Sequence, residues 1–408
     1  MTCCYRLLFL FFCVLYLDVA HAFYDWHTAQ SQGNARASMR GFAIATQKPA
    51  NPTFYQERDD EALGGIARLI IDTQVGHSWH FDINAYQTWL PNSLVTSENG
   101  VDTVLDVERS GALEWSHSDD DYAHLAIDRL SLRKSLTNAD ISIGRQPINL
   151  ATTFFFSPND FFAPFAAQAF YRVYKPGVDA MRADISFSEL TQLSLIGVQG
   201  YRGEPGSDSG WSDSGERLRN SYLARFATNL ANTEWALLAG KVRRTRISGG
   251  SISGELFDWL GLRAEGHVVE ELDENSDDKT ELSIGLEHRW ENSLFLQLEQ
   301  FYHGSGATAI AEYADSLTGD SNYLARRYQA LGLSYEFNPL LTGQMTIIQN
   351  AIDHSRLYSI NTLYSLSDES ELSISLTVPQ GKEPEGLAIK SEFGRYPKVL
   401  NVELRAYF

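Results

Sequence analysis

The part of this chain that follows residue 22 lacks cysteine. All three cysteines, Cys3, Cys4 and Cys13, lie in the first 22 residues. Disulfides, catalytic thiols and thiolate metal sites are therefore excluded from the remainder. Basic residues are also scarce, since 33 Lys and Arg face 52 Asp and Glu and leave a net charge of −19. Without a basic stripe, this balance argues against nucleic acid as a partner.

Long hydrophobic runs are absent after residue 22, so no membrane-helix candidate appears there. The run at residues 7–17 is too short to cross a bilayer comfortably. It follows Arg6 and precedes the small-x-small sequence Ala20-His21-Ala22. These flanks are typical of a signal peptide. We predict a signal peptide at residues 1–22 and a single domain at residues 23–408.

The last ten residues alternate between apolar and polar side chains. Leu400, Val402, Leu404, Ala406 and Phe408 share one face of a strand, and polar side chains occupy the other. The apolar face continues to the terminal aromatic residue. Such a closing strand resembles the sorting signal of bacterial outer-membrane β-barrels. The alternative is a C-terminal edge strand of a soluble β-domain.

Similar strands follow one another along the chain, and short turns alternate with long or polar connections. This order is typical of outer-membrane barrels, with short periplasmic turns, longer external loops and both termini periplasmic. The fold that we predict is all-β: a transmembrane antiparallel up-and-down β-barrel of about 18 strands (16 is the alternative) with one inward-folded loop. The expected strands cover residues 36–46, 65–73, 78–89, 122–133, 140–145, 181–187, 192–200, 217–228, 234–246, two within 250–266, 282–290, 294–302, 323–337, 341–349, 358–366, 372–378 and 399–408, with a long polar connection at 91–121.

Charges of both signs lie opposite the apolar face of these strands, which predicts a wet interior, since unpaired charge in lipid is costly. A barrel of this size encloses more space than side chains fill. The inward charges and the unfilled space together predict a water-filled channel. The expected inward residues are Arg182, Arg219, Arg225, Arg263, Arg289, Arg405, Asp82, Asp184, Glu265, Glu281, Glu287, Glu299 and Glu403, with His80, His124 and His267.

Residues 146–172 show neither strand nor helix periodicity. Seven phenylalanines and three prolines fall within the segment, and an aromatic connection of this length must pack against something. It resembles the inward constriction loop of porins. Arg145, Asp160, Arg172 and Lys175 would then lie near the narrowest point. In the alternatives, the aromatics cap a neighbouring protomer or cover the barrel mouth. The predicted pore-lining residues are Arg145, Asp160, Arg172, Arg182, Arg219, Arg225, Arg263 and Arg289.

Catalytic and metal-binding motifs are missing. The sequence contains no HExxH, no GxSxG and no phosphate-binding glycine loop of the expected form. No Ser/His/Asn or Asp/His set lies in positions that match the barrel lipases or proteases. The acidic stretches 119–121 and 273–278 lack calcium-loop spacing and are expected to be solvated or bridged to lipid phosphates. We therefore expect no enzyme, no cofactor and no metal site.

Two motifs resemble the alginate-export type of eighteen-stranded porin-like proteins. The first is Gly144-Arg145-Gln146 followed by Ser157-Pro158-Asn159-Asp160-Phe161, and the second is the ending Glu392-Phe393-Gly394-Arg395-Tyr396-Pro397 with Tyr407-Phe408. The resemblance covers residues 23–408, the part that follows the predicted signal peptide. It implies passage of anionic polysaccharide or small solutes, although the accompanying acidic residues weaken the case for an anionic polymer.

These patterns predict a porin-like channel in the outer membrane of a Gram-negative bacterium. It would pass solutes passively, with anionic sugars or polysaccharide as the implied cargo. The expected partners are outer-membrane lipid and lipopolysaccharide, the barrel-assembly machinery, and a small solute or oligosaccharide. The alternative is a barrel that acts as an adhesin or envelope-assembly partner through its external loops.

Overall fold

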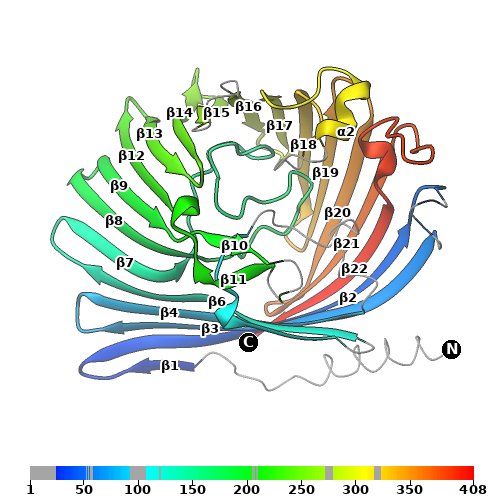
Figure 1. Ribbon diagram of the computed structural model, residues 1–408. Coiled ribbons are helices and arrows are strands. Elements are labelled where there is room, and N and C mark those ends of the chain that lie inside the picture. The colour runs from blue at the N-terminus through cyan, green and yellow to red at the C-terminus, as the bar shows by residue number, and fades with distance from the viewer. Residues whose placement is uncertain are drawn as a thin grey trace.

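The structure is a computed structural model that describes residues 24–51, 53, 55, 58–91, 107–118, 121–204, 207, 210–271, 279–316 and 323–408. The chain forms a closed antiparallel β-barrel, and Figure 1 looks along its interior. The predicted signal peptide and the acidic stretches 119–120 and 273–278 lie outside the described residues. None of the described helices is long and apolar enough to cross a membrane.

Among the described residues, twenty strands share one sheet. Two of them, β1 and β5, each pair along one edge with a single neighbour, so eighteen strands form the wall. The last wall strand pairs with the first through the register Ser38↔Tyr407 to Gln47↔Lys398, which closes the cylinder. A closed sheet leaves no unpaired edge among its wall strands. The predicted eighteen-stranded barrel is confirmed.

The wall strands in their order around the barrel are β2 (Ser31–Gln47), β3 (Asp59–Val75), β4 (Trp79–Pro91), β6 (Asp121–Ser135), β7 (Ala139–Gln146), β8 (Val178–Ser188), β9 (Thr191–Val198), β12 (Ser221–Leu230), β13 (Thr233–Val242), β14 (Thr245–Leu256), β15 (Leu260–Glu271), β16 (Lys279–Arg289), β17 (Phe295–His303), β18 (Arg327–Asn338), β19 (Leu341–Asn350), β20 (Arg356–Ser367), β21 (Ser370–Gln380) and β22 (Lys398–Tyr407). The remaining described elements are β1 (Tyr24–His27), β5 (Glu114–Ser118), β10 (Tyr201–Gly203), β11 (Trp211–Gly215), η3 (Gly111–Leu113), η4 (Arg217–Arg219), η5 (Ile310–Glu312), α2 (Tyr313–Ser316) and η6 (Phe393–Arg395).

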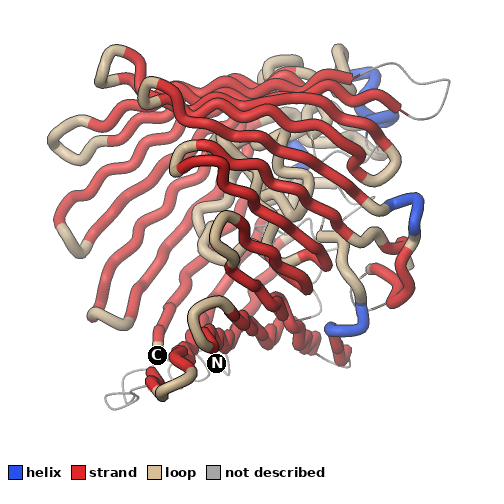
Figure 2. Tube along the Cα trace, turned by 90° about the vertical axis from the view of Figure 1, so that its left-hand side faces the viewer, coloured by secondary structure: helices blue, strands red, loops and turns tan. Residues whose placement is uncertain are grey.

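The two ends of the barrel differ. Tight turns such as those after β3, β8, β12, β18 and β20 lie at one end, together with the C-terminus. Figure 2 shows these short hairpins on its left and the helical segments on its right. The connection at residues 147–177, between β7 and β8, is the third one at the long-loop end, after 48–58 and 92–120. The expected alternation of short and long connections has two exceptions at the long-loop end: β13 and β14 are joined by only Arg243 and Arg244, and β19 and β20 by residues 351–355.

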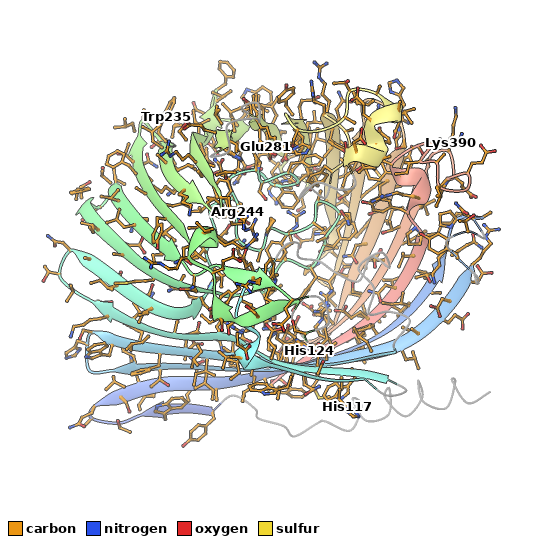
Figure 3. The ribbon with its side chains drawn as sticks, in the orientation of Figure 1. His117, His124, Trp235, Arg244, Glu281 and Lys390 are labelled. Carbon is orange, nitrogen blue, oxygen red and sulfur yellow. The ribbon has the colours of Figure 1, made fainter. Side chains whose placement is uncertain are left out.

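The outer face of the wall is apolar. The exposed apolar side chains of the wall strands belong to one alternating set, and Figure 3 labels one of them, Trp235, on the outside of the wall. Exposed aromatics also gather near the tight turns, among them Phe187, Phe257, Trp259 and Phe337. An apolar belt with an aromatic rim suits a barrel surrounded by lipid. The exposed apolar side chains of the belt include Leu69, Phe81, Ile143, Met181, Leu195, Phe226, Trp235, Ile284, Leu298, Ile360, Ile374 and Leu400.

Several predicted strand boundaries differ from the observed ones, and three of the differences concern a misplaced turn or an additional element. The expected strand 234–246 is two strands, because Arg243 takes a positive φ of 50° and turns the chain between β13 and β14. The expected strand 217–228 begins only at Ser221, since Arg217–Arg219 form a 3₁₀ turn. The connection at 91–121 contains β5, which pairs with β6 at residues 122–126, beyond the end of β7.

Candidate functional site

The segment 147–177 lies within the outline of the wall in Figure 1, and its contacts with Glu265 and Glu299, both in the middle of wall strands, place it inside the barrel. We call it the inward segment. It leaves β7, meets the inner face of β15 and β17, and returns along β2, β3 and β6 to β8. The sequence predicted this inward path for residues 146–172.

Two wall carboxylates hold the first arm of the inward segment. Glu299 on β17 accepts the backbone N–H groups of Phe154, Phe155 and Phe156 at 3.0, 3.0 and 2.6 Å. Glu265 on β15 accepts the N–H of Thr152 and, at 3.3 Å, that of Asn159. A carboxylate is acceptor-only, so it satisfies several converging N–H donors at once. Each glutamate therefore fixes the backbone of the segment against the wall.

Apolar packing stabilises the same arm. The ring of Phe156 stacks on that of Phe301 from β17, with centroids 4.9 Å apart. Phe155 and Phe156 are almost fully buried in a cluster that includes Tyr328 and Ile348. A second cluster packs Ile148, Leu150 and Phe162 of the segment against inward side chains of β8, β9 and β12–β14. The aromatic composition of the segment is thus explained by burial against the inner wall.

A buried ion pair joins the two arms of the inward segment. Lys175 Nζ lies 2.5 Å from Asp160 Oδ2 and donates to the carbonyl of Ala163 at 2.9 Å. Burial raises the pKa of Asp160 and lowers that of Lys175, while the attraction between the two charges opposes both shifts. The pair therefore cross-links the arms within a low-dielectric environment.

The second arm contacts arginines on the opposite wall. The ring of Tyr171 lies 4.0 Å from the guanidinium of Arg40 on β2 and 4.4 Å from that of Arg405 on β22. The ring of Tyr174 lies 4.4 Å from the guanidinium of Arg68 on β3. Such cation–π contacts strengthen where water is excluded. The inward segment consequently touches the wall on both sides of the lumen.

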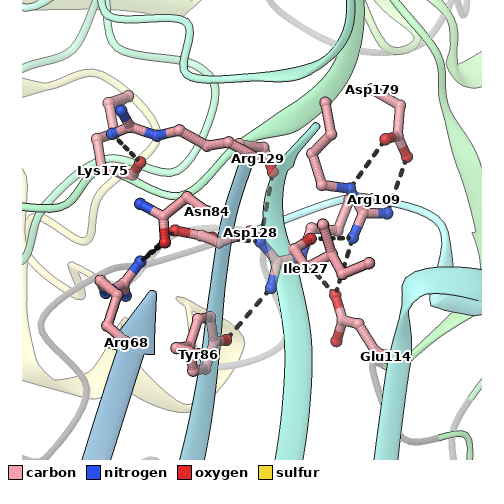
Figure 4. Close-up of polar contacts among 12 residues, drawn as sticks. Arg68, Asn84, Tyr86, Arg109, Glu114, Ile127, Asp128, Arg129, Lys175 and Asp179 are labelled. Atoms are coloured by element: carbon pink, nitrogen blue, oxygen red, sulfur yellow. Dashed lines mark hydrogen bonds and ion pairs between the residues drawn. The ribbon is translucent and has the colours of Figure 1, made fainter. Parts of the chain in front are cut away.

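The base of the inward segment is held by a cluster of charged side chains (Figure 4). Arg145 pairs with Asp179 at 2.9 Å and donates to the carbonyl oxygens of Ile127 and Ser110. Arg109, from the connection before β5, pairs with Asp128 at 2.8 Å. The cluster ties β6, β7, β8 and the second external connection together where the segment begins.

Gly144 shapes the start of that base. Its φ is 117°, and a Cβ at this position would lie 2.2 Å from the carbonyl oxygen of Leu130. Only glycine permits this close approach of β7 to β6. In the Gly144-Arg145-Gln146 motif, the glycine therefore allows the backbone conformation that places the Arg145 side chain in the buried cluster.

The predicted pore-lining residues separate into two groups. Arg145 is 2% exposed and fully engaged, so it supports the segment and is not available to a solute. Arg172 donates to carbonyls of its own segment, including Ala167 at 2.9 Å, and burial lowers its pKa to about 10. Asp160 is likewise buried. These three positions shape the inward segment from within.

Each of the other five predicted arginines contacts a different partner. Arg182, Arg225 and Arg263 alternate with the exposed apolar residues and so face inward, whereas Arg219 lies in η4 at the outer end. Their pore-lining role remains a prediction. The contacts are Arg182 with Asp184, Arg219 with Glu108, Arg225 with Glu234, Arg263 with Glu287, and Arg289 over the ring of Phe295 at 4.6 Å.

Sequence reasoning missed Arg40, Arg68, Arg109 and the two tyrosines of the second arm. Arg40 lies in the expected strand 36–46. Because it follows the apolar Met39, which is exposed on the outer face, alternation would have predicted that Arg40 faces inward. Arg109 has no comparable signal, because it lies in an irregular connection. Among the described residues, no group of three or more His, Asp or Glu side chains forms a metal-binding arrangement.

Solved structures with the same architecture are numerous, although no protein-family profile and no curated protein matches the chain. OccAB3 of Acinetobacter baumannii has a TM-score of 0.58 at 12% identity and covers 92% of this chain and 99% of its own. OccK8 (OprE) of Pseudomonas aeruginosa scores 0.56 at 11% identity over 92% and 98%. The outer membrane protein OpdK of the same species scores 0.54 at 10% identity over 92% and 98%.

The chain has the fold of these outer-membrane barrels. The similarity is one of architecture, because sequence identities of 10–12% do not indicate that two proteins share a substrate. The similarity extends over almost the whole of each protein, so the entire barrel is matched. The expected porin-like architecture is confirmed, and the narrower alginate-export resemblance is not what these three structures show.

Proposed function

We propose that this protein is a porin-like channel of the outer membrane through which small hydrophilic solutes pass passively. The observation that carries the proposal is the inward segment, which contacts opposite walls of an eighteen-stranded barrel. A segment held at both sides narrows a lumen without moving with the solute. Pre-formed anchoring of this kind suits a size-selective constriction.

The location follows from the outer face. Its apolar belt requires a lipid surround, and a closed barrel satisfies every wall strand's backbone groups there. OpdK, which shares the fold, is an outer membrane protein. We place this chain in the same membrane, with lipopolysaccharide and lipid as its surroundings and the assembly machinery reading its terminal Phe408.

The inner charges favour small solutes over a long polyanion. Arg40 is paired with Glu403 at 2.8 Å, and Arg68 with Asp128 at 3.0 Å. Because each of these cations is already paired, a repeating anionic chain gains little from contacting them. Small anionic sugars, which need one or two contacts, remain our first choice of solute. The alginate-export assignment is a narrower version of this proposal and depends on the sequence motifs alone.

Bilayer conductance with a single introduced cysteine tests the proposal. Val173 lies on the inward segment and is 60% exposed. The sequence after residue 22 has no native cysteine. In Val173→Cys the introduced cysteine is therefore the only thiol there that a methanethiosulfonate reagent can modify. We expect an open channel in the unmodified protein and a clear fall in conductance when the bulky charged reagent attaches.

Leu237→Cys is the matched control. Leu237 is 69% exposed on the outer face of β13, where the reagent lies outside the lumen. Its modification should leave conductance unchanged. A folded barrel without conductance would instead favour the adhesin or assembly role, and equal effects at the two positions would refute the constriction.

A further inference from the structure

Three side chains at the long-loop end of the barrel form a hydrogen-bonded series. Glu281 on β16 and His303 on β17 are direct partners across the two strands. His303 Nδ1 lies 2.7 Å from Glu281 Oε1, and its Nε2 lies 3.1 Å from the hydroxyl oxygen of Ser305. A hydroxyl, an imidazole and a carboxylate in this order are the components of a nucleophilic serine site.

The lumen side of the wall carries this series. Leu282 and Ile284, which alternate with Glu281 and Ser283 along β16, are exposed on the outer face. Glu281 therefore points inward, as does His303, which is almost fully buried. Figure 3 labels Glu281 on the side of the wall where the inward segment contacts β15 and β17, the neighbours of β16. A neighbouring histidine, His267, is engaged with Asn159 of that segment at 3.1 Å.

Ser305 stands on a rigid turn between two glycines. The Gly304 N–H donates to Thr280 O at 2.9 Å, and the Gly306 N–H donates to His303 O at 3.0 Å. A Cβ on Gly304 would lie 2.5 Å from Thr280 O, and one on Gly306 would lie 2.2 Å from a backbone oxygen of Ala325. Both positions therefore require glycine. The turn holds the exposed hydroxyl of Ser305 beside the imidazole.

The hydrogen bonds assign the imidazole tautomer. A carboxylate accepts only, so the His303 proton resides on Nδ1 and points to Glu281. Nε2 then carries a lone pair and accepts from the Ser305 hydroxyl. This is the state in which an imidazole removes the proton of an attacking serine.

We propose that Ser305, His303 and Glu281 form a hydrolytic site for small water-soluble carboxylic esters that enter the outer mouth of the barrel. Ser305 is the nucleophile, His303 the general base, and Glu281 the positioning residue that holds the tautomer. Membrane lipids are excluded as substrates because the site faces the lumen. The proposal does not depend on the channel being open, and it revises the sequence-based expectation that the chain is not an enzyme.

The reaction needs only the ester and water. Ser305 Oγ forms a bond to the acyl carbon while its proton passes to His303 Nε2. The ester C–O bond then breaks, and the leaving alcohol takes that proton. In the second half, His303 removes a proton from water, the resulting hydroxide attacks the acyl group, and the proton returns to Ser305 as the acid leaves.

A fluorophosphonate probe on the purified, folded full chain tests the site. We expect labelling at Ser305, found by mass spectrometry of the digested protein, and its loss in Ser305→Ala. Ser316→Ala changes another serine at the same end and should label normally. General-base assistance contributes about 10²–10⁴-fold, so His303→Gln should slow labelling, and p-nitrophenyl acetate hydrolysis, by about 10²-fold or more.

Glu281 needs a readout beyond activity. Glu281→Gln should slow labelling and change its dependence on pH, while Glu281→Asp should restore part of the rate. Heat-modifiable migration confirms folding in each variant, and Ser305→Ala should retain the parental conductance. A folded parent protein that resists the probe, or a Ser305→Ala variant that labels as well as the parent, would overturn the proposal and leave the channel assignment standing.

Discussion

Phe408 and Ala37 exchange two backbone hydrogen bonds: the Phe408 N–H donates to Ala37 O at 2.7 Å, and the Ala37 N–H donates to Phe408 O at 2.8 Å. The final residue of the chain thus completes the seam between β22 and β2. Its side chain is nearly buried at the tight-turn end. Phe408 therefore both contributes the last backbone hydrogen bonds that close the sheet and supplies the aromatic side chain at the end of the strand.

Deleting Phe408 should lower the amount of folded barrel in the outer membrane, because both backbone bonds and the terminal aromatic are lost. Quantitative fractionation with heat-modifiable migration provides the measurement. Phe408→Ala keeps the backbone bonds and removes only the ring. Normal levels in the deletion would contradict the role in assembly, and a normal level in Phe408→Ala alone would assign that role to the backbone.

A pair of neighbouring substitutions tests the lipid-facing side of the wall. Ile374 is 43% exposed on β21, whereas Ser375 next to it belongs to the inward set. Ile374→Arg should lower the free energy of unfolding by about 2–4 kcal/mol, since a charge near mid-membrane is poorly solvated. Ser375→Arg should have little effect. Urea unfolding in lipid vesicles measures both, and equal effects would rule out a lipid surround.

Removing the Glu299 carboxylate should loosen the inward segment. Glu299→Gln replaces an oxygen that accepts N–H groups with an amide that donates, which leaves buried donors unpaired at about 1–3 kcal/mol each. We expect higher or noisier single-channel conductance. Glu336→Gln, an exposed inward position near the tight turns on the neighbouring strand β18, is the control. Identical traces from both variants would show that Glu299 does not fix the constriction.

A pH-dependent stability should come from the external loops. Burial raises the pKa of Glu392 to about 7, while hydrogen bonds from the Tyr328 hydroxyl, the Leu324 N–H and Asn350, together with the charge of Arg395, partly oppose the shift. In the unfolded chain this carboxyl titrates near 4.5. The folded state holds the proton more tightly, so the group's stabilising contribution is complete below pH 4.5.

That contribution should be lost as the pH rises from about 4.5 to about 7, by up to about 3 kcal/mol. Hydrogen exchange, corrected for its intrinsic pH dependence, should show connection 381–397 opening more readily at pH 8 than at pH 5. Glu392→Gln should flatten this difference. Faster opening at pH 5 than at pH 8 in the parent protein would contradict the raised pKa.

The sequence predicted the barrel well because a membrane wall imposes strict alternation. Within the expected strand 372–378, that rule alone places Ile374 and Ser375 on opposite faces, and the exposures agree. The same alternation, where it is interrupted, also predicted the turns at Asp258 and Asn338. The turn at Arg243 was not predicted, because only two residues separate β13 from β14 and no Gly, Pro, Asn or Asp lies there to mark a break, although the inward positions change from even numbers (Val242) to odd numbers (Ile247).

The candidate site was only partly predictable. The aromatic content of residues 154–162 required a packed environment, which indicated an inward path. Which arginines support the segment and which face solvent depends on contacts between distant residues, such as Arg145 with Ser110. Alternation carries no information about residues outside strands. The Ser305 series was missed because it depends on a cross-strand pair followed by a turn, a pattern that no sequence motif describes.

The arrangement of β1 has a consequence for how this barrel could be rebuilt. Along β2, Phe408 of the seam stands opposite Ala37, and Tyr24 of β1 stands opposite Ala35. Strand β1 therefore continues β22 in the same line and direction, separated on β2 by Arg36. In a version that starts at Tyr24, a covalent link from Phe408 to Tyr24 would give a circular protein, which could be reopened at any tight turn as a circular permutant. Such a permutant would keep the wall but place Phe408 in the middle of a continuous strand.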